Sequence, residues 1–453
     1  MNIVPIFRSR RAEPIQAAAR WAVSSVPAHL SARGLAVPLW AALLLPLAAL
    51  LPLLSPWASL LLAPAFALAA GLRLAALGNL FLRPPPPAPP LTGSDLPTAT
   101  VLVPLFREAS IFPDLAAALA RLDYPAHLLE VIILLEEGDA ATIAAARSTA
   151  PAHWRIVVVP PGRPQTKPRA CNVGLALASG DLVVVFDGED RPEPGQARLA
   201  AAALAADPRL AVVQARLGCD HAGPGSPIVA RLWALEYAAL FGAILPLLSR
   251  LGLPFLLGGT SNWFRASALR AAGGWDAHNV TEDADLGVRL ARMGWRSGTI
   301  DSTTWEEAPV RVGAWLRQRA RWFKGFAVTA IVHARDPRRT MRELGAPGLI
   351  ALSAQLPVAL LCAAAHPLGL IGAAGDPSGP LAALLLLGYL SAAALHAAAA
   401  PRAGLPVWLA LLLPFYWLLH WAALLLALSD LARDPAHWRK TSHGEATGRQ
   451  AAA

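Results

Sequence analysis

The sequence predicts an α/β domain with a mostly parallel sheet, inserted between α-helical membrane segments. Of the 453 residues, 55% are hydrophobic and only 15% are charged, whereas about 25% of the residues are charged in a typical soluble domain. The apolar residues are concentrated before residue 83 and after residue 344, so the bilayer is the expected solvent for those parts. Between them, short β-branched runs alternate with Ala- and Leu-rich stretches, which is typical of βαβ units.

The N-terminal part begins with a polar, Arg-bearing segment, 1–35, which is expected on the cytosolic side. It does not resemble a cleavable signal peptide, because the first apolar run begins only near Leu35. Residues 36–82 are almost continuously apolar. Since one span needs about 20 residues, they predict a hairpin of two transmembrane helices that turns near Ser55-Pro56. A single long tilted helix followed by a buried segment is the alternative.

Residues 83–94 form a proline-rich linker, a stiff spacer that marks a domain boundary. The α/β domain is expected over 95–310, and amphipathic helices at the membrane interface over 311–344. The predicted strands are Ala99–Leu105, Leu129–Leu135, Arg155–Val159 and Asp181–Phe186, and the predicted helices include Phe112–Leu122 and Ala140–Ala146.

The remaining chain, 345–428, is expected to contain about three transmembrane segments, followed by a polar tail over 429–453. The segments are 346–374, 381–400 and 405–428. Three spans would place the C-terminus outside, whereas the basic residues Arg433, Arg439 and Lys440 favour the inside. Two alternatives would reconcile these signals: one segment lies in the membrane interface, or the first segment breaks at His366-Pro367.

The charge pattern excludes some functions. The net charge is +9, but the arginines lie mainly beside apolar segments, which fits the positive-inside rule, and no aromatic-rich basic motif predicts a nucleic-acid partner. The three cysteines are far apart and form no C-x-x-C. A disulfide framework or a zinc site is therefore not expected, in agreement with a cytosolic soluble domain. A transporter is disfavoured because no predicted span contains a clear buried charge.

The segment Asp187-Gly-Glu-Asp190 follows the most β-rich run of the domain. Ligands of parallel sheets bind beyond the carboxyl ends of the strands, and Glu108 and Glu136 also follow predicted strands. Two carboxylates two residues apart can reach one hard cation, and Mg²⁺ usually combines one or two carboxylates with substrate phosphates. A diphosphate leaving group needs such a metal. A solvated acidic turn is the simpler explanation of an isolated D-x-E.

The segment Thr281-Glu-Asp283 opens a predicted helix. An N-cap followed by acidic residues is a sufficient structural explanation, because both stabilise a helix start. The functional interpretation is that one carboxylate faces the cleft and accepts the proton of an acceptor hydroxyl.

The segment Gln318-Arg-Ala-Arg-Trp322 lies in a helix-like run, Val312 to Val332. Residues three and four apart share a helix face, arginine can hold a diphosphate through two hydrogen bonds, and an indole can stack on a sugar ring. A basic amphipathic helix at the membrane interface is the alternative. Lys167 opens another predicted helix, where its charge opposes the helix dipole. This placement suggests that Lys167 binds a phosphate, and a plain surface lysine is the alternative.

In this order, the motifs resemble those of the inverting glycosyltransferases of family 2, and within them the processive, membrane-integrated branch of cellulose, chitin and hyaluronan synthases. The resemblance covers roughly residues 95 to 330 by motif order and the flanking spans by layout. It implies a cytosolic GT-A domain, which is Rossmann-like, between transmembrane helices. The strings Trp275 to Leu290 and Asp301 to Pro309 resemble a bacterial, cellulose-synthase-like subgroup.

The resemblance implies a role for each motif. Glu108 and Glu136 would contact the uridine of the donor. Asp187 and Glu189 match the D-x-D that binds the diphosphate with Mg²⁺ or Mn²⁺. Asp283 would be the general base. The substrate contacts would come from Lys167, Thr281, Glu282, Gln318, Arg319, Arg321 and Trp322, of which the last four match the Q-x-x-R-W clamp for the pyrophosphate and the acceptor sugar.

Two departures from the family pattern matter: the D-x-D is D-x-E, and nothing after Leu428 is long enough for a PilZ module. The expected function is metal-dependent transfer from a UDP-sugar, UDP-glucose by default, to a growing β-linked polysaccharide. The enzyme is expected in a bacterial inner membrane, with a cytoplasmic catalytic domain and with export or periplasmic proteins as further partners. The alternatives are transfer of one sugar to a polyprenyl-phosphate or other lipid acceptor, and a non-catalytic membrane scaffold or receptor.

Overall fold

The computed structural model of the chain describes residues 9–54, 59–83, 86–220 and 222–435. An eight-stranded sheet has the order β3-β2-β1-β4-β7-β6-β8-β5. The strands are β1 (Ala99–Leu105), β2 (Leu129–Glu136), β3 (Arg155–Val159), β4 (Leu182–Val185), β5 (Arg191–Pro192), β6 (Leu210–Asp220), β7 (Asn262–Arg265) and β8 (Arg296–Glu307). The four predicted strands are thus present, and the sheet is mostly parallel, as predicted. β7 is the exception in the middle, because it runs antiparallel to β4 and β6.

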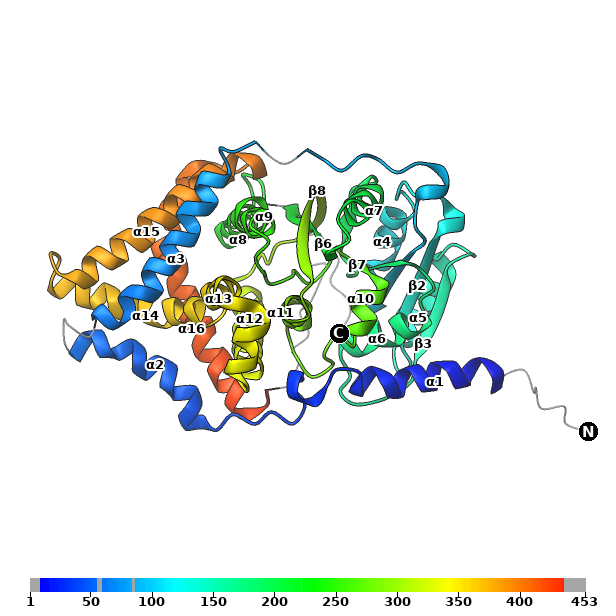
Figure 1. Cartoon of the computed structure of the whole chain (residues 1–453), viewed down its shortest axis with the longest axis horizontal. Coiled ribbons are helices and arrows are strands. Elements are labelled where there is room, and N and C mark those ends of the chain that lie inside the picture. Colours follow the sequence, from blue (N-terminus) through cyan, green and yellow to red (C-terminus); the bar gives the residue numbers. More distant parts are fainter. Residues whose placement is uncertain (1–8, 55–58, 84–85, 221, 436–453) are drawn as a thin grey trace, which may run out of the picture.

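The strands of this sheet are apolar on both faces because both faces are covered. Val101 and Val103 pack into one apolar cluster, and Leu102 between them packs into the other. Strands buried on both faces have nearly continuous apolar sequences. The helices of the domain are α4 (Phe112–Leu119), α5 (Ala140–Thr149), α6 (Lys167–Leu177), α7 (Gln196–Ala206), α10 (Ala266–Ala271) and α11 (Glu282–Arg292) (Figure 1).

The first described helix, α1 (Ser9–Ser24), lies against the α/β domain and not among the apolar helices (Figure 1). The Asn172 amide of α6 donates to the carbonyl of Ala22 at 3.0 Å and to the carbonyl of Trp275 at 2.7 Å. One buried side chain therefore joins the N-terminal segment to the loop that precedes α11.

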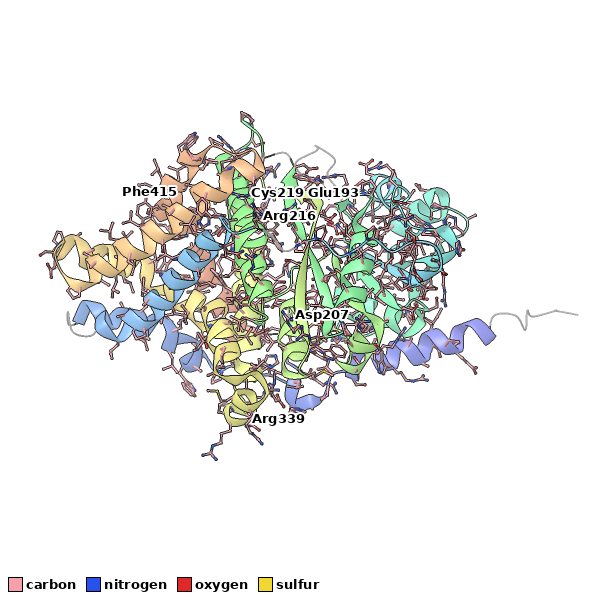
Figure 2. All side chains as sticks on the ribbon, turned by 45° about the horizontal axis from the view of Figure 1, so that its top comes forward. Glu193, Asp207, Arg216, Cys219, Arg339 and Phe415 are labelled. Carbon is pink, nitrogen blue, oxygen red and sulfur yellow. The ribbon has the colours of Figure 1, made fainter. Side chains whose placement is uncertain are left out.

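Five helices in the described part of the chain are long and apolar enough to cross a membrane: Leu61–Asn79, Ile228–Arg250, Pro337–Gly375, Pro380–Ala403 and Val407–Arg433. A shorter apolar helix covers Leu39–Leu50. Several of their large side chains face outward, including Trp40 at 68% exposed and Phe415 at 70% exposed. Figure 2 shows Phe415 among these helices, far from the charged side chains Glu193 and Asp207 of the α/β domain. Exposed apolar surface of this kind marks contact with a membrane or a partner.

The predicted N-terminal hairpin corresponds to α2 (Leu39–Leu54) and α3 (Ser59–Asn79), and its predicted turn at Ser55-Pro56 lies outside the described residues. The apolar helix over 228–250 was not expected. It consists of α8 (Ile228–Ala239), the π-helical turn η6 (Leu240–Ile244) and α9 (Leu245–Arg250). It connects β6 to β7 and packs against β6, so it belongs to the α/β domain by sequence order.

The C-terminal helices are α12 (Val312–His333), α13 (Pro337–Gln355), α14 (Pro357–Gly375), α15 (Pro380–Ala399) and α16 (Leu413–Arg433). The proposed break at His366-Pro367 is wrong, because α14 continues through Pro367. The break lies at Leu356, whose φ of −106° and ψ of −88° are not helical. Leu356 precedes Pro357, and the ring of a proline disfavours helical backbone in the residue before it.

α16 lies along α12, and this arrangement bears on the side of the C-terminus. Near its start, the Tyr416 hydroxyl accepts a hydrogen bond from the Trp315 indole of α12 at 2.8 Å. At its end, the carbonyl of Asp434 accepts from Lys324 of α12 at 3.4 Å. α12 itself contacts the α/β domain, because Arg321 donates to the Val280 carbonyl at 2.8 Å. α16 therefore packs along a helix that itself contacts the α/β domain, and the side of the C-terminus stays a prediction.

Candidate active site

One cavity of about 730 Å³ lies at the carboxyl ends of β1, β2 and β4 and continues between the apolar helices. Every side chain that the sequence motifs single out lines this cavity. These are Glu108, Glu136, Lys167, Asp187, Glu189, Thr281, Glu282, Asp283, Gln318, Arg319, Arg321 and Trp322. They come from strand ends, from the starts of α6 and α11, and from the middle of α12.

Glu108 and Glu136 line the wall beyond β1 and β2. Glu136 is buried, accepts a hydrogen bond from the Gln165 amide at 3.2 Å and lies 4.0 Å from the Arg169 guanidinium. Burial raises its pKa. Gly188 lies close to Glu108, because a Cβ at this position would lie 2.8 Å from Glu108 Oε2 and would displace that side chain. The glycine lets the loop after β4 approach the end of β1.

The loop after β4 carries the acidic residues. Both oxygens of Asp187 contact the ammonium group of Lys167, at 2.7 and 2.8 Å, and this group also donates to the Gly259 carbonyl at 2.6 Å. Burial opposes the charge of Lys167, but Asp187 and Asp283 outweigh it, and the pKa of Lys167 is raised. Asp190 points into the protein, where its carboxylate accepts from the backbone N–H of Asp187 at 2.6 Å and thereby shapes the loop.

The described residues contain no group of three or more His, Cys, Asp or Glu side chains that could hold a metal by itself. The two carboxylates of the D-x-E nevertheless fit a cation that shares its ligands with a diphosphate. The surrounding charge supports this fit. Burial, Glu189 and Asp190 raise the pKa of Glu306, which lines the same cavity, and a divalent cation would relieve this repulsion. Glu306 was not among the predicted site residues, and strand β8 carries it to the cavity wall.

Asp283 lies in the first turn of α11 and is 7% exposed. Its Oδ1 accepts a hydrogen bond from the Trp275 indole at 2.9 Å. Burial and the neighbouring Glu282 raise its pKa well above the usual range. Thr281 is at the N-cap position, but its side chain makes no capping hydrogen bond, and the backbone N–H of Thr281 donates to Asn279 instead. Helix capping by the Thr281 side chain therefore does not explain the motif.

The residues of the Q-x-x-R-W segment point in different directions. Arg321 reaches the loop before Thr281 through the Val280 carbonyl. Trp322 stacks on Tyr237 with ring centroids 6.2 Å apart and an interplanar angle of 15°. The Arg319 guanidinium lies 4.7 Å from the centroid of the Trp322 ring and forms an ion pair with Glu236. In this structure the anionic partner of Arg319 is therefore a carboxylate of α8.

Sequence reasoning missed the polar cluster around Glu236. This side chain accepts hydrogen bonds from the Tyr416 hydroxyl at 2.7 Å and from His420 Nε2 at 3.0 Å, in addition to Arg319. The predicted segments nevertheless contain polar groups that line the cavity, namely His420 in the predicted last segment and Arg73 in the predicted hairpin. A lone acidic residue in the apolar run of α8 is the signal that could have indicated this cluster.

Replacing Trp275 with Phe is expected to slow the proposed proton transfer most at low pH. The indole hydrogen bond lowers the pKa of Asp283, so its loss raises that pKa further, and less of the deprotonated base is present below it. Because hydrogen bonds to charged groups contribute about 1.5–3 kcal/mol, we expect a rate loss of about tenfold at acidic pH and a smaller loss at alkaline pH. The measurement is the pH profile of kcat. An equal loss at every pH would indicate a packing role only.

Replacing Gly325 with Ala is expected to lower activity at least tenfold by moving the start of α11. A Cβ at Gly325 would lie 2.1 Å from Thr281 Oγ1, closer than atoms can approach. Gly313 on the same helix is the matched control, because its Cβ would meet nothing nearer than Arg317 at 3.6 Å, and alanine favours a helix by about 1 kcal/mol. Turnover and melting temperature of both variants test this. Equal turnover in both would contradict the close packing of α12 on Thr281.

Comparison with known proteins identifies a family and several similar glycosyltransferases. The family profile described as "Glycosyl transferase family group 2" matches residues 182–432. The chain is 25% identical over 248 residues to the probable glycosyltransferase YdaM of Bacillus subtilis (strain 168), covering 51% of this chain and 56% of that protein. It is 27% identical over 275 residues to the beta-monoglucosyldiacylglycerol synthase of Synechocystis sp. (strain ATCC 27184 / PCC 6803 / Kazusa), covering 57% of this chain and 55% of that protein. The chain spans about half the length of the curated relatives it matches.

Two further relatives extend this comparison. The glucomannan 4-beta-mannosyltransferase 7 of Arabidopsis thaliana is 25% identical over 238 residues, covering 51% of this chain and 42% of that protein. Among solved structures, the mannosyltransferase PcManGT from Pyrobaculum calidifontis, in complex with GDP-Man and Mn²⁺, has a TM-score of 0.55 at 22% identity. This likeness covers 81% of this chain and 97% of that one, and it concerns the fold.

Proposed function

Because this chain belongs to glycosyl transferase family group 2 and has a GT-A domain beside apolar helices, we propose that it is an inverting glycosyltransferase acting at a membrane. One observation carries the proposal. A single cavity contains the acidic loop after β4, the buried carboxylate of Asp283 and the aromatic face of Trp322, and it continues between helices that fit a bilayer. The retention of all these groups argues against a non-catalytic scaffold.

The donor would bind at the carboxyl ends of the strands. We assign Glu108 and Glu136 to its nucleoside, and Asp187 and Glu189 to its diphosphate together with Mg²⁺ or Mn²⁺. A divalent cation bound there would supply neutralisation of the charge on the leaving diphosphate. The donor is proposed to be a UDP-sugar, with UDP-glucose as the default from the family resemblance.

The chemical step would be a single displacement. Asp283 accepts the proton of an acceptor hydroxyl, and the oxygen attacks the anomeric carbon. The bond from that carbon to the diphosphate breaks, its electron pair leaves with the nucleoside diphosphate, and the configuration inverts. Lys167 and Arg321 line the same part of the cavity and would stabilise the departing negative charge. Thr281, Glu282 and Gln318 would orient the substrates.

The terminal sugar of the acceptor would contact Trp322, which lines the cavity and is packed against Tyr237 and Arg319. We propose a growing β-linked polysaccharide as the acceptor. The continuation of the cavity between the apolar helices supports a path for the polymer through the membrane. The proposed location is a bacterial inner membrane, with the catalytic domain in the cytoplasm and export or periplasmic proteins receiving the product.

A second candidate is the transfer of one sugar to a polyprenyl-phosphate or other lipid acceptor. The observation that favours it is Arg73, a cation in the wall of the cavity among the apolar helices. Product length separates the two candidates.

The experiment is incorporation of label from UDP-glucose by purified protein in lipid vesicles, with Mg²⁺ or Mn²⁺. A product of high molecular mass supports the polymer, and a short lipid-extractable product supports the second candidate. If a panel of nucleotide sugars gives no transfer, no hydrolysis and no binding, the transferase proposal is wrong.

A further inference from the structure

The membrane half of the cavity contains a positive charge. Arg73 lies on α3, six residues before Asn79, the last residue of that helix. Its guanidinium donates to the Gly388 carbonyl of α15 at 3.3 Å and lies 5.6 Å from the centroid of the Trp417 ring of α16. The side chain therefore points into the helix bundle and lines the cavity. An arginine that serves only to reach the lipid headgroups would instead extend outward from the bundle.

No carboxylate among the described residues forms an ion pair with Arg73. Glu236 of α8 is an acidic residue that lines the same cavity. It is already bound by Arg319, Tyr416 and His420. A charge among membrane helices is costly, and such residues usually face a cavity and bind a substrate or an ion. The contacts that the structure shows for Arg73, a carbonyl and an aromatic ring, leave its charge without a counter-ion.

The surroundings of Arg73 fit an anionic group with an apolar tail. Phe66 of α3, Leu385 and Tyr389 of α15, and His366 of α14 also line the cavity. Of these, His366 contacts the same Trp417 ring as Arg73. The acidic groups around Asp283 line the same cavity. A ligand that fills the cavity can thus place a hydroxyl near the base, a negative group at the cation and a hydrocarbon chain between helices.

The surroundings of Arg73 indicate the class of anion. Six helical residues correspond to about 9 Å along the helix axis, measured from the end of α3 that leads to the α/β domain. Arg73 therefore lies within an apolar helix that is long enough to cross a membrane, and an anion would reach it most readily as part of a lipid. Phosphate is an anion that membrane lipids commonly carry, and a guanidinium binds it through two parallel hydrogen bonds.

We propose that Arg73 binds the phosphate of a lipid-linked acceptor, whose chain lies among α3, α14 and α15. This inference rests on the proposed transferase function and specifies its acceptor. The anchor serves a single transfer to a lipid-linked sugar, which is one form of the second candidate above, and it would also serve the priming of a growing chain on such a sugar.

Binding tests the site without any need for turnover. The full-length protein in detergent is titrated with a short polyprenyl phosphate, with the corresponding polyprenol and with inorganic phosphate, and complexes are counted by native mass spectrometry. We expect the lipid phosphate to bind at least tenfold more tightly than the alcohol, and inorganic phosphate to bind weakly. In Arg73→Gln this preference should disappear, and in Arg73→Lys it should persist in part. Arg402→Gln is the matched control, because Arg402 is exposed at the end of α15 and does not line the cavity.

Kinetics then separates this proposal from the transferase function. With a lipid-phosphate-linked sugar as acceptor, Arg73→Gln should raise the acceptor KM at least tenfold, whereas the control Arg402→Gln should leave both this KM and the hydrolysis of the donor unchanged. A lipid-phosphate preference that survives in Arg73→Gln would overturn the assignment, as would equal binding of the phosphate and the alcohol. Tight binding of inorganic phosphate at Arg73 would show an anion site for free phosphate and would also overturn it. If the wild type does not hydrolyse the donor, this result counts against the transferase function alone. The binding measurements still test the phosphate site at Arg73, because they do not depend on turnover.

Discussion

Replacing Asp283 with Asn is expected to lower transfer by about 10³-fold, because general base catalysis contributes about 10²–10⁴-fold. The asparagine keeps the size of the side chain, and its carbonyl oxygen can still accept the Trp275 hydrogen bond that Asp283 Oδ1 accepts at 2.9 Å. We therefore expect donor affinity and melting temperature to stay close to those of the wild type. The measurement is the rate of a single turnover with bound donor and saturating acceptor.

Asp301→Asn is the matched control for this prediction, because Asp301 is 84% exposed and pairs only with Arg216 in the described contacts. Its transfer rate should equal that of the wild type. A rate loss below tenfold in Asp283→Asn, with intact donor binding, would assign the base to another group, and the neighbouring Glu282 would be tested next.

Replacing Asp187 with Asn and Glu189 with Gln together is expected to lower transfer at least 10²-fold and to abolish its response to metal. Metal ions contribute several kcal/mol by neutralising developing charge. The loss of Asp187 also removes the carboxylate that holds Lys167 at 2.7 Å, so the donor diphosphate loses two of its proposed contacts. The measurement is the rate as a function of Mn²⁺ concentration, before and after chelation.

The wild type is the reference for this titration, and Asp301→Asn again serves as the control. We expect chelation to stop the wild-type reaction and added Mn²⁺ to restore it. A wild-type reaction that continues at full rate after chelation would falsify the metal assignment, while leaving Asp283 as the base.

The fold and the grouping of the site residues could be predicted because both depend on local rules. Strand β1 has the predicted bounds, because a short, nearly continuous apolar run that is rich in β-branched residues is typical of a strand buried on both faces. The carboxyl ends of neighbouring parallel strands lie at one edge of the sheet, so Glu136 and Asp187 were expected together, and both line the cavity.

The parts that could not be predicted depend on contacts between distant segments. Glu236 is 83 residues from Arg319 and 184 residues from His420, and no local pattern connects them. The antiparallel strand β7 enters the middle of the sheet after a long apolar helix, which interrupts the βαβ pattern. Two prolines, Pro357 and Pro367, both permit a break, and tertiary packing places it at the first.

The cavity that opens toward both the aqueous domain and the apolar helices has a kinetic consequence. A water-soluble donor and a bilayer-confined acceptor would reach it from different phases, so neither needs to leave before the other enters. For such an enzyme the reaction rate depends on the mole fraction of acceptor among the lipids of the bilayer, and not on the acceptor concentration in the whole sample. Diluting the acceptor with inert lipid at constant bulk concentration should then slow the reaction, whereas diluting the vesicles in buffer should not.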